Sequence, residues 1–252
     1  MPRYFLEFSY LGTNYSGFQF QINAISVQQK IEEALEVVLR KKVRLTGSSR
    51  TDTGVHAEQN FAHFDFEEKF PDKFLKRVNG VLTDDIALKS CREVSDESHA
   101  RFDAHARSYE YRISFEKNPF LHERCWFYPY DELPIEKLNE TAAILKEFDD
   151  FASFSKTRTQ VKTTICNIQT AEWIRKNDLL IFCVTANRFL RGMVRALVAS
   201  QIRVARGLIT SGEFRKLIEE KNQSQIDFSA PASGLFLVEV KYPPEIFKQT
   251  IE

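Results

Sequence analysis

The segment of residues 47–57 combines small, turn-forming and ionisable residues more densely than any other part of the chain. It follows a predicted strand, and loops in that place commonly carry the functional groups of α/β proteins. Asp52 stands between Arg50 and His56, and a neighbouring cation favours the ionised form of a carboxyl group. An ionised aspartate can act as a nucleophile or as a base. A structural interpretation stays open, in which Asp52 caps its own turn and Arg50 is a surface partner.

The triplet Asp52-Thr53-Gly54 is also the signature of aspartic proteases. Those enzymes need two such aspartates that share one proton, supplied by two lobes or by a dimer. The sequence contains no second Asp-Thr-Gly triplet. Arg50, two residues before the aspartate, would hold it fully ionised and prevent proton sharing. The protease hypothesis is therefore disfavoured.

Arginines are concentrated in residues 179–212, a stretch without an acidic residue. The pattern predicts a helix over residues 187–208, and a helical wheel places its arginines within a sector of roughly 120°. These arginines are Arg188, Arg191, Arg195, Arg203 and Arg206. Such a stripe suits phosphates, and more cations precede the Asp52 loop at residues 40–44, so we expect a polyanion close to a reactive carboxylate. The alternative is a solvated face whose partners come from elsewhere in the fold.

A third group of residues lies on a strand predicted over residues 106–115. Arg107, Tyr109 and Tyr111 alternate along it and share one face. Tyrosines beside arginines on a sheet form a platform on which nucleic acid bases stack. The alternative is that Tyr109 is a core residue whose hydroxyl is bound to a neighbour.

The elements that position these residues form two similar series. The first half reads as β-α-β-β-α-β-β, with helices at about 27–40 and 71–82 and strands at about 4–10, 43–45, 59–66, 86–94 and 106–115. The second half reads as a helix begun by Pro134, strands at about 162–175 and 179–185, the arginine-rich helix, a short helix after Ser211 and a strand at 235–242. We expect an α/β (α+β) fold of two related mixed subdomains, 1–115 and 116–252. We expect these subdomains to have ferredoxin-like or RRM-like topology and to form a central, mostly antiparallel sheet with a catalytic cleft between them.

Composition excludes several classes of protein. The 252 residues include 35 Lys plus Arg and 35 Asp plus Glu, so a polybasic protein is excluded while a local basic surface is not. Hydrophobic residues make up 43%, as in ordinary globular proteins, and 22 Phe predict an aromatic core. Polar residues interrupt every long uncharged run and the start does not resemble a signal peptide, so we expect a cytoplasmic protein. Four cysteines without a C-x-x-C pair predict free thiols rather than a zinc site: Cys91, Cys125, Cys166 and Cys183.

Several motifs together resemble those of the tRNA pseudouridine synthases of the TruA type. The segments are Tyr10–Thr13, Gly17–Gln21, Gly47–Ala57, Ala100–Ala104, Arg107–Arg112, Asp150–Phe154, Phe189–Arg195 and Ala230–Leu235. The strongest is Arg50-Thr51-Asp52-x-Gly54-Val55-His56-Ala57, whose seven fixed residues make a chance match improbable. The chain departs from the family pattern at Phe18, usually Trp, at Asp149, commonly His, and at Cys166, commonly Arg.

The resemblance implies isomerisation of uridine to pseudouridine at positions 38, 39 and 40 in the anticodon stem-loop of tRNA. It implies a homodimer that needs no metal or organic cofactor. It also implies that Asp52 is the catalytic aspartate, that Tyr109 contacts the target base and that Arg195 pairs with the aspartate. For Arg50, Arg188 and Arg191 we expect contacts with substrate phosphates. A non-catalytic RNA-binding protein of the same fold stays open as an alternative.

Overall fold

The computed structural model describes residues 1–156 and 163–251. The chain forms two compact units, Met1–His105 together with Leu237–Glu252, and Ala106–Phe236. These units do not coincide with the division expected at residues 115 and 116, because the strand at 106–114 groups with the second unit and the chain's end with the first. Both units mix strands and helices, so the expected α/β class is confirmed.

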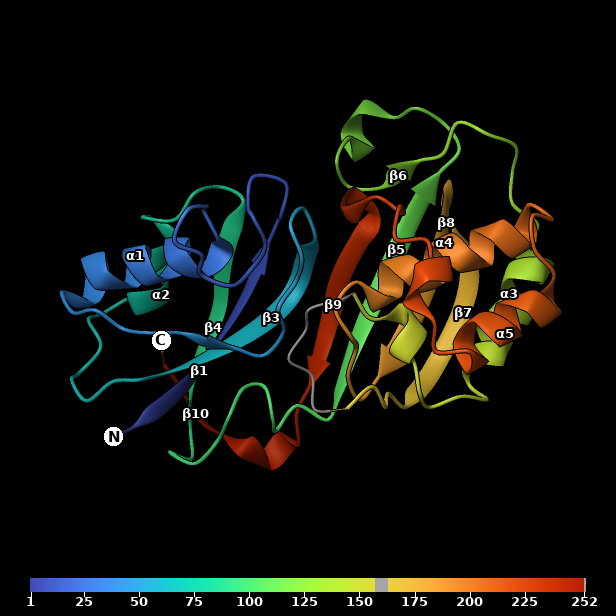
Figure 1. The fold of residues 1–252 in the computed structure, drawn as a ribbon. Helices are drawn as coiled ribbons and strands as arrows, with labels where there is room; N and C mark the ends of the chain where they lie inside the picture. Colours follow the sequence, from blue (N-terminus) through green and yellow to red (C-terminus); the bar gives the residue numbers. More distant parts are fainter. Residues whose placement is uncertain (157–162, 252) are drawn as a thin grey trace. The chain divides into compact units, whose positions relative to one another are not determined.

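The first unit is an antiparallel sheet with two helices (Figure 1). Its elements are β1 (Arg3–Tyr10), α1 (Val27–Leu39), β2 (Thr46–Gly47), β3 (His56–Asp65), α2 (Phe74–Asn79), β4 (Ile86–Val94) and β10 (Phe247–Ile251). The strand order is β10-β4-β1-β3, and β2 pairs with β3. Helix α1 begins where predicted, because the Ser26 hydroxyl accepts a hydrogen bond from the Gln29 amide at 3.2 Å.

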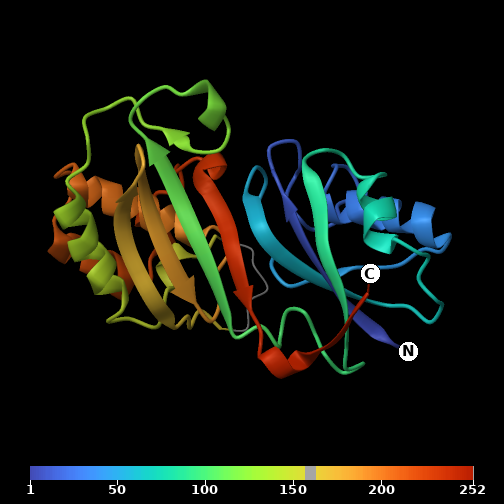
Figure 2. The ribbon, with the colours of Figure 1, turned by 180° about the vertical axis from the view of Figure 1, so that it is seen from behind.

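In the second unit, helices cover one face of the strands, as the two opposite views in Figures 1 and 2 show. Its elements are β5 (Ala106–Ser114), β6 (Trp126–Phe127), α3 (Ile135–Leu145), β7 (Ile168–Lys176), β8 (Leu179–Ala186), α4 (Met193–Ala205) and α5 (Ser211–Glu219). Strands β5, β8 and β7 pair antiparallel in that order, and β6 pairs parallel to β5. Strand β9 (Leu235–Lys241) begins in this unit and ends in the first. Short 3₁₀ turns connect the longer elements: Pro119–Leu121, Ala152–Phe154, Gln223–Gln225, Ala232–Gly234 and Pro244–Ile246.

Aromatic side chains dominate both cores, as the 22 phenylalanines predict. In the first unit the Phe8 and Phe18 rings stack with centroids 5.6 Å apart, and both side chains are almost completely buried. In the second unit Trp173 and Phe182 lie 5.1 Å apart, and the Trp173 ring nitrogen donates to the Gln201 carbonyl oxygen at 3.0 Å. This last contact ties α4 to the sheet.

The predicted helix over 187–208 is wrong at its beginning, since α4 begins at Met193. Gly192 precedes it with φ 74°, a left-handed conformation that a continuous right-handed helix does not contain. The backbone before it is instead tied to another segment, because the Asn187 amide donates to Asn167 O at 3.1 Å. The predicted strand at 43–45 is also wrong; the strand at this place is β2.

Candidate active site

The loop with Asp52 connects β2 to β3 and is fastened to the end of β1. The Tyr10 hydroxyl lies 2.8 Å from the Thr51 hydroxyl, and both side chains are buried. Asn60 Nδ2 donates to Ser49 O at 3.2 Å, and the Ser48 amide donates to Phe61 O at 2.7 Å. These contacts fix the backbone on both sides of Arg50 and immediately before Asp52.

A second segment, residues 11–18, packs against the same loop so closely that two glycines are required. A Cβ atom on Gly12 would lie 2.0 Å from Val55 O, and one on Gly17 would lie 2.6 Å from Thr51 O. Gly17 also has φ 92°, which side chains of L-residues rarely tolerate. The Phe18 amide donates to Thr51 O at 3.2 Å, so the two segments are also joined by a backbone hydrogen bond.

His56 has a different role from the one expected. Its side chain is fully buried and its Nδ1 accepts a hydrogen bond from the Gly12 amide at 3.0 Å. A ring nitrogen that accepts a hydrogen bond carries no proton, so the imidazole is neutral in this arrangement. His56 therefore adds no cation beside Asp52, and it anchors the segment of residues 11–18 instead. Sequence reasoning missed this role, although Gly12 and Gly17 both lie in the motifs quoted above.

Two charged side chains of this loop remain accessible. Asp52 is half-buried, and Arg50 is exposed. The turn after Asp52 is closed by a hydrogen bond of 3.1 Å from the Val55 amide to Asp52 O, with Gly54 at φ 75°. The loop thus presents a carboxylate and a guanidinium two residues apart on a fixed backbone.

The expected platform of β5 is only partly present. Tyr109 is half-buried, and its ring packs edge-on against Phe189 with centroids 5.1 Å apart. Tyr111 is fully buried and donates its hydroxyl hydrogen to Pro231 O at 2.8 Å, so it offers no face to a base. Arg107 is buried too, and its Nη1 donates to Asn187 O at 3.0 Å. Tyr109 is the residue of this group that can reach a ligand.

The five arginines do not share one face, because α4 begins after the first two. Arg188 is half-buried and Arg191 is exposed, both in the connection before the helix. Arg195 lies in the first turn of α4, where Nε donates to Ala230 O at 2.6 Å and Nη2 to Phe228 O at 3.3 Å. Arg203 donates to Gln225 O at 3.5 Å, and Arg206 follows the helix with its guanidinium 5.4 Å from the Tyr130 ring. The predicted stripe is thus replaced by five separate environments.

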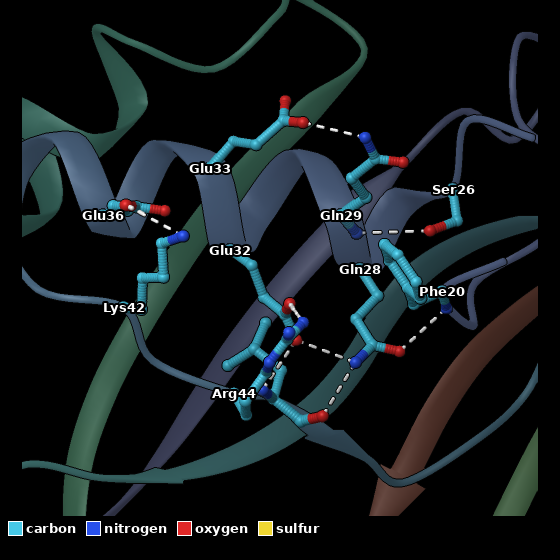
Figure 3. A network of polar contacts seen from close by, with 10 residues as sticks. Phe20, Ser26, Gln28, Gln29, Glu32, Glu33, Glu36, Lys42 and Arg44 are labelled. Carbon is cyan, nitrogen blue, oxygen red and sulfur yellow. Dashed lines mark hydrogen bonds and ion pairs between the residues drawn. The ribbon is translucent and has the colours of Figure 1, made fainter. Parts of the chain in front are cut away.

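A cavity of about 300 Å³ adjoins the Asp52 loop within the first unit, and we call it the Phe102 pocket. Its lining residues are Phe18, Gln19, Gln28, Leu45, Thr46, Gly47, Arg50, His99, Arg101 and Phe102. One wall is fixed by the network in Figure 3, in which Gln28 Nε2 donates to Glu32 Oε1 at 2.8 Å and to Leu45 O at 2.9 Å. The buried Glu32 carboxylate also accepts from the Leu45 amide at 2.9 Å and from Arg44 Nη1 at 3.1 Å. The pocket is lined by four separate segments of sequence, so no local sequence pattern could have predicted it.

Metal ligands and reactive thiols are not part of this site. Within residues 1–156 and 163–251, no group of three or more His, Cys, Asp or Glu residues could hold a metal ion. Burial raises the pKa of Cys91 to about 12 and the pKa values of Cys166 and Cys183 to about 11. No helix in the described part of the chain is sufficiently long and apolar to span a membrane.

Comparison with known proteins places this site in a family. A family model described as tRNA pseudouridine synthase matches residues 148–243. A tRNA pseudouridine synthase A from Parabacteroides distasonis is 45% identical over 249 residues, covering 98% of each chain. Its counterpart from Bacteroides fragilis is 43% identical, covering 98% of this chain and 99% of the relative. The one from Gloeobacter violaceus is 37% identical, covering 96% of this chain and 81% of the relative.

These similarities extend across both compact units and define an enzyme, an isomerase of the pseudouridine synthase class. The chain belongs to the tRNA pseudouridine synthase A family. The resemblance inferred from the sequence motifs is thereby confirmed.

Proposed function

We propose that this enzyme isomerises uridine to pseudouridine at positions 38, 39 and 40 in the anticodon stem-loop of tRNA, with Asp52 as the catalytic carboxylate. The observation that carries the proposal is 45% identity over nearly the whole length to a relative named tRNA pseudouridine synthase A. The geometry of the loop supports it, since Asp52 is half-buried on a backbone held by Tyr10, Gly12 and Asn60.

The reaction breaks the bond between N1 and C1′, turns the uracil and forms a bond between C5 and C1′. The C5 proton is lost and N1 gains one, so the reaction neither oxidises nor reduces the nucleoside and consumes no ATP. A carboxylate at the site can attack C1′, attack C6 or remove the 2′ proton of the ribose. A stacked uridine must first leave the helix at a cost of about a few kcal/mol, and aromatic stacking repays part of this cost.

In this proposal Tyr109 contacts the displaced base, Arg195 supports the aspartate, and Arg50, Arg188 and Arg191 contact phosphates. The support for Arg195 is its orientation by two carbonyl oxygens, which holds a guanidinium at a defined place in its own unit. The ferredoxin-like relation of the two subdomains, the cleft between them, the homodimer and the cytoplasmic location stay predictions. The strand order β4-β1-β3-β2 of the first unit supports a ferredoxin-like topology there.

The test is incubation with unmodified tRNA, followed by mapping of pseudouridine with carbodiimide and primer extension. We expect modification by the unaltered protein and a loss of several orders of magnitude in Asp52→Asn, with tRNA binding retained. Asp84→Asn is the matched control, because Asp84 is an exposed carboxylate in the same unit outside the loop. More than about a tenth of the activity in Asp52→Asn would refute the assigned role. Modified tRNA that carries pseudouridine elsewhere than positions 38 to 40 would refute the assigned positions.

The homodimer is tested separately by sedimentation. Two copies of the 29.3 kDa chain should move as one particle at assay concentrations. A fully active particle with the mass of one chain would refute the dimer.

A further inference from the structure

We propose that the Phe102 pocket binds one unpaired nucleotide next to the target uridine, with its base stacked on Phe102 and its phosphate bound by Arg50 and Arg101. This inference rests on the proposed function, because it names a second contact of the same RNA. It assigns a role to the segment Ala100–Ala104, which the catalytic site leaves unused.

The aromatic platform is exposed but ordered. The Phe102 side chain is 72% exposed, an unusual state for a large apolar ring. One side of it packs against the His99 ring with centroids 4.2 Å apart. The turn is closed by hydrogen bonds from the Phe102 and Asp103 amides to His99 O, at 3.1 and 3.0 Å, and from the His99 amide to Asp103 Oδ2 at 2.8 Å. A ring that is already held in place loses little conformational entropy when a base stacks on it.

Buried residues of the first unit hold the turn of residues 99–103 in place. The Ala100 amide donates to Nδ1 of His63, at 3.1 Å, and the Tyr242 hydroxyl donates to Ala100 O. His63 and Tyr242 are both buried. Exposure of Phe102 is therefore built into the fold and does not result from a loose segment.

The charge of the pocket matches a phosphate. Arg50 and Arg101 are exposed and line the cavity, and none of the described residues that line it is an aspartate or glutamate. Arginine forks bind phosphate oxygens through charge-assisted hydrogen bonds, so two of them beside an aromatic ring match one nucleotide.

One polar side chain is placed to read the edge of the base. The amide of Gln28 is occupied, since it donates to Glu32 and Leu45 and accepts from the Phe20 amide at 3.0 Å (Figure 3). Gln19 is exposed, and within the described part of the chain its side chain has no hydrogen-bond partner. Its amide group can both donate and accept, as recognition of a base edge requires.

Residues of the Asp52 loop form part of the pocket wall. Arg50 lines the pocket and lies two residues before Asp52, while Phe18, beside Gln19, donates its amide hydrogen to Thr51 O. An RNA strand that places a uridine at Asp52 therefore passes this pocket with an adjacent nucleotide. The volume of about 300 Å³ lies at the lower end of ordinary ligand sites and suits a single nucleotide rather than a duplex.

The test measures the affinity of the full chain for a labelled, unmodified tRNA anticodon stem-loop by fluorescence anisotropy. We expect Phe102→Ala to weaken binding about tenfold, Phe102→Leu to weaken it equally, and Phe102→Trp to retain it, because stacking needs a π face and not only apolar volume. Arg101→Ala should weaken binding and reduce the salt slope by about one. Its matched control is Arg77→Ala, an exposed arginine of the same unit on α2, which should change neither quantity.

A change in the RNA identifies the nucleotide. Two stem-loops are made, one with an abasic residue immediately before the target uridine and one with it immediately after. One of the two should bind the unaltered protein about tenfold more weakly than the intact stem-loop does. With that RNA, Phe102→Ala should cause no further loss, because the stacking partner is already gone. Additive losses with both abasic RNAs would overturn the assignment.

The outcomes separate this inference from the proposed function. Equal affinities for the unaltered protein and Phe102→Ala overturn the nucleotide pocket, while pseudouridine formation by the same preparation leaves the proposed function standing. Equal losses in the Leu and Trp variants also overturn it. An unaltered protein that binds the stem-loop with the expected Phe102 dependence but forms no pseudouridine refutes the catalytic proposal alone.

Discussion

Removal of one oxygen atom, in Tyr10→Phe, tests whether the Asp52 loop depends on its contact with β1. The Tyr10 hydroxyl is buried and lies 2.8 Å from the Thr51 hydroxyl and 3.5 Å from Asn60 Nδ2. The substitution keeps the ring and its packing against Phe8, and it leaves the buried Thr51 hydroxyl without this partner. Such a loss costs about 1–3 kcal/mol, which corresponds to a fall in unfolding temperature of roughly 2–4 °C for each kcal/mol.

The loop contact should also appear in the rate. Thr51 adjoins Asp52, so loss of this contact should displace the carboxylate. If the displacement raises the activation free energy by about 1.4 kcal/mol, kcat falls about tenfold. The matched control is Tyr15→Phe, which removes hydroxyl contacts with Thr83 at 3.0 Å and Asp85 at 2.6 Å. It should cost similar stability and leave kcat within about twofold. Thermal unfolding and single-turnover formation of pseudouridine measure the two effects, and equal kcat values for both variants would refute the positioning role of Tyr10.

Other contacts of the structure give three further expected outcomes. Gly17→Ala should reduce kcat and also lower the melting temperature, because the added Cβ would lie 2.6 Å from Thr51 O at a residue with φ 92°. Single-turnover kinetics and thermal melting of this variant measure the two effects, and an unchanged kcat would contradict the close approach. Burial, with Arg3 and His99 nearby, lowers the pKa of His63 to about 4, so the unfolded state binds an extra proton between pH 6.5 and 4 and stability falls as the pH falls through that range. His63→Gln should flatten the dependence of unfolding free energy on pH in this range, as measured by urea titrations at several pH values. An unchanged dependence would assign it to other groups. Arg195→Ala should lower kcat more than it raises KM and the exposed Arg191→Ala the reverse, so identical profiles would remove the distinction.

The sequence predicted those elements whose signals are local. Ser26 and the apolar spacing behind it predicted α1 within one residue, and the strand predicted at 86–94 has the bounds of β4. The start of α4 was missed because it depends on tertiary contacts. Residues around Asn187 have the pattern of a helix, yet their backbone bonds to Asn167, and the chain turns at Gly192 before α4 begins.

The candidate site divides in the same way. Asp52 and Arg50 stood out through their types and spacing, whereas the groups that support them are distant in sequence. Gly12 reaches His56 across 44 positions, and the Phe102 pocket unites segments near Gln19, Arg50 and Phe102. Such contacts cannot be predicted from the sequence, because periodic patterns indicate local structure only and do not show which distant segments meet. Tyr111 shows the opposite error, since strand alternation placed it beside Tyr109 and only packing shows that it is buried.

Several contacts that hold the Asp52 loop are made by neutral groups, while the side chains expected to meet RNA are charged. Tyr10, Asn60 and the neutral His56 ring supply hydrogen bonds that salt hardly affects, because screening acts on charges and acts least on buried groups. Arginine–phosphate contacts weaken steeply with salt, because binding releases counterions from the RNA. Salt should therefore change how much RNA is bound without changing the position of the carboxylate. This separation explains how a chain with 35 basic and 35 acidic residues can serve a polyanionic substrate: a few exposed arginines beside a loop held by neutral hydrogen bonds are sufficient.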